Sequence, residues 1–192
     1  MASALFIVLD VDGVLHPLAE NGLPANAKFE ALSARADEEP IEDDGVRIAR
    51  TVPGEFEPHC MAELARAVAE TGADIVLSST WRETGPLRRA VDAKLQEFFM
   101  PASVGATPRL SVLRGGRAAE ILAWAAEQPA ATRWVALDDL DLRLGPVTLT
   151  DEHFLHVDPR TGLTAAGADQ LIALLGATVT AETLVAAAKR TG

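Results

Sequence analysis

The sequence LFIVLDVDG, residues 5–13, decides the fold of this protein. Its first five residues form an uninterrupted apolar run, which is typical of a β-strand covered by helices on both faces of a parallel sheet. The run ends at Asp10, and a second carboxylate follows at Asp12. Two carboxylates held side by side at the end of a buried strand repel each other, and a bound cation is a common compensation. The stretch therefore predicts a central strand with a charged site at its carboxyl end.

The rest of the chain alternates strand patterns with helix patterns. Short apolar runs predict further strands at residues 74–77, 102–106, 134–137 and 153–157. Apolar residues at helical spacing predict helices at residues 58–71, 87–98, 118–125, 166–175 and 180–190. We expect the first of these helices to stop at Gly72. This alternation predicts an α/β domain of three layers with a mostly parallel five-stranded sheet.

Polar residues follow three of the predicted strands. Asp10 and Asp12 come after the first, Ser78-Ser79 after the second, and Asp138-Asp139 after the fourth. Parallel sheets bind their ligands beyond the carboxyl ends of the strands. We therefore expect carboxylates and hydroxyls to meet at one edge of the sheet, with Arg82 close to them.

Length and composition limit the classes of protein to consider. The 192 residues suit one domain, residues 1–192, and the 48% of hydrophobic residues argue against disorder. The net charge of −11 argues against a general nucleic-acid-binding module. The single cysteine, Cys60, excludes an internal disulfide and a multi-cysteine zinc site. No apolar run reaches the roughly 18 residues of a membrane span, so we expect no membrane partner and a cytoplasmic location.

Two segments depart from the average composition. Residues 19–57 are rich in Glu, Asp, Pro and Gly, and we interpret them as a flap or minimal cap over the site, with one hairpin near residues 46–52. Residues 82–117 hold seven of the 17 basic side chains but only three of the 28 acidic ones. We call residues 82–117 the basic island. Such a segment can attract an anionic ligand to an otherwise acidic protein.

These residue types suit phosphoryl transfer. Asp10, Asp12 and one of Asp138 and Asp139 offer the hard oxygen ligands that Mg²⁺ prefers. A carboxylate beside Mg²⁺ can attack phosphorus, and a second carboxylate can protonate the leaving oxygen. A hydroxyl such as that of Ser78 can hold phosphoryl oxygens. Arg117, at the start of the helix before the fourth strand, can supply the cation that this charge requires.

The ordered motifs resemble those of the haloacid dehalogenase-like (HAD) superfamily. Residues 5–15 resemble its first motif, an apolar strand followed by Asp-x-Asp-Gly, and residues 75–78 resemble its second, an apolar strand ending in Ser or Thr. Arg117 falls where the third motif has Lys or Arg, and residues 135–139 resemble the acidic fourth motif. Within the superfamily, residues 77–82 and 134–139 are most similar to the small HAD domains of Swiss army knife RNA-repair proteins.

This resemblance implies a Rossmann-like fold and a role for each motif residue. Asp10 would be the nucleophile and Asp12 the general acid and base. Mg²⁺ would be held by Asp10, by the backbone carbonyl of Asp12, and by Asp138 or Asp139. Ser78 and Arg117, with Ser79 as a further candidate, would bind the phosphoryl group.

The implied substrate is a phosphomonoester, and the small flap leaves room for a nucleotide, a nucleic-acid end or another bulky phosphate. A non-catalytic module that binds metal or phosphate, and a phosphotransferase, are the alternative functions. Arg114 is an alternative to Arg117 as the phosphate cation.

Some residues near the motifs have two possible roles. His16 and Arg82 are candidates for substrate contact, and an ion pair is the structural alternative for Arg82. Trp81 is expected to serve in packing. Cys60 has no basic neighbour in its predicted helix, so we expect an unreactive thiol.

Overall fold

The computed structural model describes most of the chain, with gaps. The described residues are 4–19, 42–43, 46–47, 56–110, 115–130 and 132–176. Most of the predicted flap at 19–57 and the predicted helix at 180–190 lie outside these residues, as does Arg114. The flap therefore stays a prediction.

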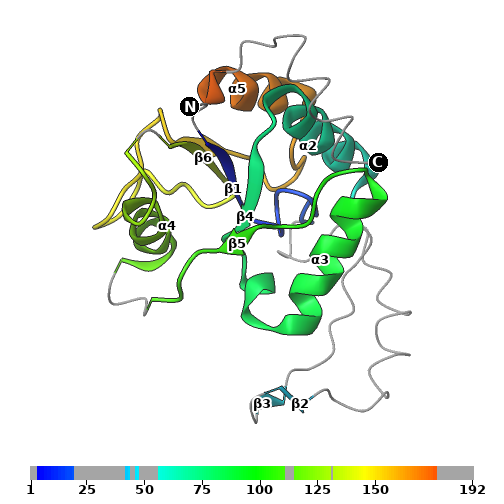
Figure 1. Ribbon diagram of the computed structural model, residues 1–192, viewed down its shortest axis with the longest axis horizontal. Helices are drawn as coiled ribbons and strands as arrows, with labels where there is room; N and C mark the ends of the chain where they lie inside the picture. The colour runs from blue at the N-terminus through cyan, green and yellow to red at the C-terminus, as the bar shows by residue number, and fades with distance from the viewer. Residues whose placement is uncertain are drawn as a thin grey trace.

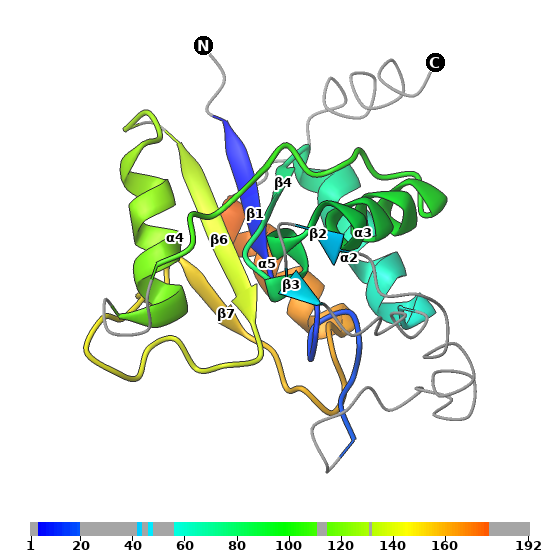
Figure 2. The same cartoon turned by 90° about the horizontal axis from the view of Figure 1, so that it is seen from below.

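A single parallel sheet of five strands forms the middle layer (Figures 1 and 2). In spatial order its strands are β5 (Gly105–Ala106), β4 (Asp74–Leu77), β1 (Leu5–Leu9), β6 (Arg133–Asp138) and β7 (Phe154–His156). Strand β1, which is the apolar run at residues 5–9, lies at the centre, and Leu9 pairs with both Leu77 and Leu137. The α/β sheet is confirmed, and all of its strands run parallel.

Helices cover both faces of the sheet. Those with bounds in the structure are α2 (Pro58–Thr71), α3 (Gly85–Glu97), α4 (Gly116–Ala126) and α5 (Ala165–Leu175). Helix α4 packs on one face, and α2, α3 and α5 lie on the other, as Figure 2 shows. A short 3-10 helix, η1 (Thr80–Glu83), links β4 to α3. This arrangement has the three predicted layers.

Side-chain alternation along the strands divides the core into two hydrophobic clusters. In β1, Ile7 and Leu9 belong to the larger cluster, with α2, α3 and α5, whereas Val8 belongs to the smaller one, with α4. We call the smaller one the α4 cluster. Alternate residues of a strand point to opposite faces, so the uninterrupted apolar run of β1 is explained by burial on both faces.

Most predicted elements are present, with small shifts at their ends. Helix α2 ends at Gly72, which adopts a φ of 68°, as expected for a helix-terminating glycine. Strand β5 is shorter than predicted, with two residues. The hairpin pairs β2 (Glu42–Asp43) with β3 (Val46–Arg47), earlier than predicted. The dipeptide between the two strands in sequence is Asp-Gly, which favours a two-residue hairpin loop.

Candidate active site

The three central strands each carry one polar residue just beyond their last apolar position. Asp10, Ser78 and Asp138 follow the residues that pair across β1, β4 and β6, so they form one row across the sheet. The residues two positions earlier, which share their face, all belong to the α4 cluster: Val8, Val76 and Ala136. The row therefore lies on the side of the sheet that α4 covers, next to the N-terminus of that helix.

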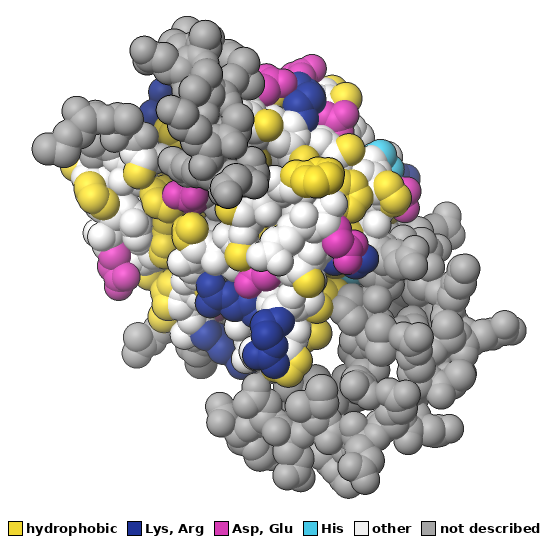
Figure 3. Space-filling view, turned by 45° about the vertical axis from the view of Figure 1, so that its right-hand side comes forward, with side chains coloured by type: hydrophobic (Ala, Val, Ile, Leu, Met, Phe, Trp, Pro, Cys, Tyr) yellow, Lys and Arg dark blue, Asp and Glu magenta, His cyan; other side chains and the backbone are white. Residues whose placement is uncertain are grey.

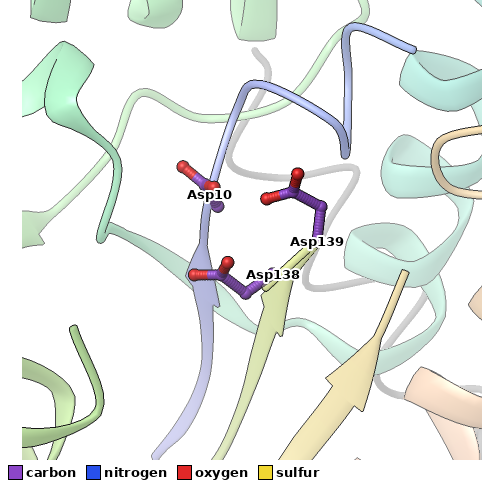
Figure 4. Close-up of side chains that lie close together, drawn as sticks. All are labelled: Asp10, Asp138 and Asp139. Carbon is purple, nitrogen blue, oxygen red and sulfur yellow. The ribbon is translucent and has the colours of Figure 1, made fainter. Parts of the chain in front are cut away.

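Three carboxylates from two of these strands converge. Asp10 follows β1, and Asp138 and Asp139 come from the end of β6 (Figure 4). One oxygen of each lies within 4.8 Å of the others. Such a group of hard oxygen atoms suits a small divalent cation. Within the part of the chain that the structure describes, the carboxylate of Asp12 is not a member of this cluster, so a ligand role for Asp12 rests on its backbone carbonyl.

Gly13 allows the first and fourth motifs to approach each other closely. It has a φ of 75°, and a Cβ built at this position would lie 2.5 Å from the carboxyl carbon of Asp139. Any larger residue would therefore both strain the backbone and displace that carboxylate. The glycine of the first motif therefore leaves the space that a member of the acidic cluster occupies.

Arg117 bridges two members of the cluster. Its Nη1 atom lies 2.7 Å from Oδ2 of Asp10 and 3.0 Å from Oδ2 of Asp138. The side chain comes from the first turn of α4 and is 17% exposed. Burial lowers the pKa of Arg117, but the two carboxylates outweigh burial and raise it overall. The guanidinium therefore stays charged in this site.

One guanidinium does not balance the acidic groups. Burial, followed by the charge of Asp10, raises the pKa of Asp138, and Arg117 only partly opposes this rise. The same causes raise the pKa of Asp139. Raised carboxylate pKa values indicate that further positive charge would be stabilising here. The donor set and its excess negative charge thus fit a divalent metal ion.

Two hydroxyl groups just beyond β4 are buried without a hydrogen-bond partner among the described residues. They belong to Ser78 and Ser79, which are both 1% exposed. Burying a hydroxyl without a partner is unfavourable by about 1–3 kcal/mol, and a ligand with acceptor oxygens would supply one. Both serines were candidates for phosphate binding in the sequence.

Thr107 extends the row to a fourth strand. Its N–H donates to the carbonyl of Leu77 at 2.9 Å, which places it level with Ser78, and its buried hydroxyl also has no partner in the described residues. Thr107 was not among the predicted site residues, although it directly follows the strand predicted at residues 102–106. A hydroxyl directly after a predicted strand was the available signal.

Asp12 is held by two aromatic side chains. Trp81 Nε1 donates to Oδ2 of Asp12 at 2.9 Å, and Nδ1 of His16 lies 3.3 Å from Oδ1. The His16 ring is 1% exposed and contacts the rings of Phe56 and Trp81. The structure therefore buries His16 against Asp12, and its contact with substrate stays a prediction. The packing expected of Trp81 is present, but its hydrogen bond was not foreseen.

Arg82 forms an ion pair, which is the structural alternative to substrate contact for this residue. Its Nη2 lies 2.5 Å from Oε2 of Glu120 on α4, with both side chains buried. Nη1 donates to the carbonyls of Ser78 and Ser79, and Nε donates to that of Thr107. This guanidinium fixes the backbone of Ser78, Ser79 and Thr107, which carry three of the buried unpartnered hydroxyls, and its donors point to protein atoms.

Comparison with known proteins identifies the family. The family model described as "HAD domain in Swiss Army Knife RNA repair proteins" matches residues 6–168. The chain belongs to this family, and the resemblance noted in the sequence is confirmed. Membership indicates hydrolase-type chemistry, typically that of a phosphatase, with a divalent metal and a phosphorylated substrate. No curated protein and no solved structure matches the chain. Among the described residues, no helix has the length and apolarity to cross a membrane.

Proposed function

We propose that this protein is a Mg²⁺-dependent phosphomonoesterase that works through an aspartyl-phosphate at Asp10. The observation that carries the proposal is the position of Asp10. Asp10 belongs to the acidic cluster and forms an ion pair with Arg117. The strand next to its own, β4, leads to Ser78 and its unpartnered hydroxyl. The proposed nucleophile, its cation and a hydroxyl donor therefore lie at the same edge of the sheet.

In the first step, a carboxylate oxygen of Asp10 forms a bond to phosphorus as the bond from phosphorus to the leaving oxygen breaks. Asp12 gives its proton to that leaving oxygen. In the second step, Asp12 takes a proton from water as the water attacks the aspartyl-phosphate and releases inorganic phosphate and Asp10. Arg117 and the hydroxyls of Ser78 and Ser79 stabilise the phosphoryl oxygens throughout.

Asp10, Asp138, Asp139 and the backbone carbonyl of Asp12 would hold Mg²⁺. When bound, the ion would neutralise charge on the phosphoryl oxygens and on the clustered carboxylates. Asp138 already accepts hydrogen bonds from Arg117 and from the N–H of Leu140. Both oxygens of Asp138 are thus oriented before any ion binds.

The proposed substrate is a bulky phosphate, such as a nucleotide or a nucleic-acid end. The family description, which refers to RNA repair proteins, supports this class. The unpartnered hydroxyls and Arg117 would bind only the phosphoryl group. Other parts of the protein would therefore contact the nucleotide or nucleic-acid portion of the substrate.

The direct test is phosphate release from an aryl phosphate, nucleoside 3′- and 5′-monophosphates and end-phosphorylated oligonucleotides. We expect release that requires Mg²⁺ and that is abolished in Asp10→Asn. Asp151→Asn is the matched control, because Asp151 is exposed and outside the cluster. Full activity in Asp10→Asn would refute the mechanism. Metal binding without turnover on any substrate would favour the non-catalytic module.

Metal binding can be measured separately by calorimetry. We expect Asp139→Asn to weaken Mg²⁺ binding about tenfold or more, because each carboxylate ligand contributes charge to the site. Asp151→Asn should bind as the wild type does. Equal affinity in Asp139→Asn and wild type would remove Asp139 from the ligand set.

A further inference from the structure

We infer that Trp81 is a positioning residue for Asp12: its indole N–H holds the carboxylate that serves as proton donor in the proposed reaction. The inference rests on the proposed function for the role of Asp12, and on the hydrogen bond between the two side chains for the role of Trp81. No motif of the sequence indicated this contact.

The hydrogen bond between Trp81 and Asp12 has favourable geometry. The distance from Trp81 Nε1 to Asp12 Oδ2 is 2.9 Å, which is near the optimum for N–H···O. An indole nitrogen is a donor only, so Trp81 can orient Asp12 but cannot take its proton. This separates the positioning role from the chemical one.

The indole itself has little freedom. Trp81 is 8% exposed, and its ring centroid lies 5.5 Å from that of Phe56 and 5.5 Å from that of His16. His16 also lies beside the second carboxylate oxygen of Asp12, at 3.3 Å. Two packed aromatic side chains therefore contact the carboxylate of Asp12, Trp81 at Oδ2 and His16 at Oδ1.

Asp12 needs such support because it is the more open of the two motif carboxylates. Its side chain is 43% exposed, whereas Asp10 is buried against Arg117. A half-exposed carboxylate samples several rotamers unless neighbouring groups restrict it. Small errors in the placement of a proton donor reduce the rate strongly.

The position of Trp81 in the chain links two motifs. It lies in η1, three residues after Ser78, so the segment that provides the phosphate-binding hydroxyls also provides the donor to Asp12. Arg82, the next residue, fixes the same segment through the carbonyls of Ser78 and Ser79. Phosphate binding and acid placement thereby depend on one short structural unit.

The test compares Trp81→Phe with Trp124→Phe. Phenylalanine keeps a ring in the core but removes the N–H. Trp124 is the matched control because it is equally buried, at 8%, but packs in the α4 cluster. The readout is kcat/KM for an aryl phosphate with a good leaving group and for an alkyl phosphate with a poor one. This ratio reports the steps up to aspartyl-phosphate formation, when the leaving group departs.

A poor leaving group needs the proton from Asp12, whereas a good one needs it much less. We expect Trp81→Phe to lower kcat/KM about tenfold or more for the alkyl phosphate, and less than about threefold for the aryl phosphate. Trp124→Phe should change both equally. Equal losses on both substrates in Trp81→Phe would overturn the inference, because a general structural defect would produce that result.

A second measurement does not depend on turnover. The Trp81 indole N–H resonance can be assigned in a ¹⁵N–¹H spectrum by its loss in Trp81→Phe or, where that variant does not fold, by elimination using Trp124→Phe and Trp134→Phe. We expect Asp12→Ala to shift this resonance and leave the other two in place. An unshifted resonance would overturn the inference. Absence of Asp10-dependent phosphate release in the wild type would instead count against the proposed function, and the spectrum would still test the hydrogen bond.

Discussion

Arg117 and Asp10 form a buried ion pair, with Nη1 of the arginine 2.7 Å from Oδ2 of the aspartate. The same nitrogen also reaches Asp138. One cation from the start of α4 therefore joins the ends of β1 and β6. This arrangement makes the stability of the site depend on charge balance as well as on packing.

Replacing the cation of this pair tests that dependence. In Arg117→Met, two buried carboxylates lose their partner, and we expect the free energy of unfolding at pH 8 to fall by about 3–5 kcal/mol. Saturating Mg²⁺ should restore part of the loss. Urea denaturation with and without Mg²⁺ measures both effects. Arg143→Met is the control, because Arg143 pairs with Asp141 on the surface, and it should leave stability unchanged. A similarly small effect in Arg117→Met would contradict the buried charge balance.

Gly13 offers a second test of the acidic cluster. Gly13→Ala forces an alanine into a left-handed conformation and pushes its Cβ against Asp139. We expect a loss of about 1–3 kcal/mol in the free energy of unfolding, together with weaker Mg²⁺ binding by calorimetry. Gly105→Ala is the matched control, since a Cβ there meets nothing within 4 Å. Unchanged metal affinity in Gly13→Ala would show that Asp139 tolerates displacement.

The buried pair of Arg82 and Glu120 connects the hydroxyl-bearing segment to α4. Arg82→Met leaves the carboxylate of Glu120 buried and unpaired, so we expect a loss of about 3–5 kcal/mol in the free energy of unfolding. The double variant Arg82→Met/Glu120→Gln should recover part of it, because Gln can still accept from the N–H of Leu110. Arg89→Met, on the exposed side of α3, is the control. Denaturant unfolding that shows no recovery in the double variant would mean that the carbonyl contacts of Arg82 dominate.

Cys60 should be inert in the folded protein. It is fully buried, and burial raises the pKa of its thiol to about 11. The thiolate, which is the reactive form, is then present in about one molecule in a thousand at pH 8. We expect no reaction with Ellman's reagent at pH 8 until urea unfolds the chain, when labelling becomes fast. Rapid labelling of the native protein would show that the helix carrying Cys60 opens readily. The sulfur lies 3.2 Å from Nε2 of His59, the preceding residue in α2. The expectation that Cys60 has no basic neighbour in its helix was therefore wrong.

The structure shows which basic side chains of the basic island are paired and which one contacts the site. Figure 3 shows a group of Lys and Arg side chains on the face that carries α3. Much of the island's charge is already paired, because Arg82 contacts Glu120, Lys94 contacts Glu97, and Arg109 contacts Glu83. Of the described island residues, Arg117 is the one that contacts the acidic cluster. The basic island therefore reaches the site through Arg117, whose charge is shared with Asp10 and Asp138.

The predictable part of the site is the part that is local in sequence. Asp10, Ser78 and Asp138 could be predicted because each directly follows an apolar strand, and a parallel sheet brings strand ends together. Arg117 could be predicted from its place at a helix start. In each case a short pattern determines both the element and the position of the side chain at its end.

The remainder depends on the directions of side chains that lie far apart in the chain. Trp81 and Asp12 are 69 positions apart, and Arg82 and Glu120 are 38 apart. The sequence shows that a tryptophan and an arginine follow β4, but which atoms they reach is decided by the path of η1 and the packing of α4. Thr107 differs from these residues, because it directly follows the strand predicted at residues 102–106 and was therefore accessible to the same argument as Ser78.

The alternation that places Asp10, Ser78 and Asp138 beside α4 makes strand length a constraint on the chemistry. Inserting or deleting one residue in β1 would turn its terminal aspartate toward the opposite layer, whereas exchanging one apolar residue for another of similar volume would not. A change of two residues would preserve the orientation but shift the height of the carboxylate. In the design of variants or chimeras on this scaffold, the number of residues in each central strand must therefore be kept, even where the identity of those residues can vary.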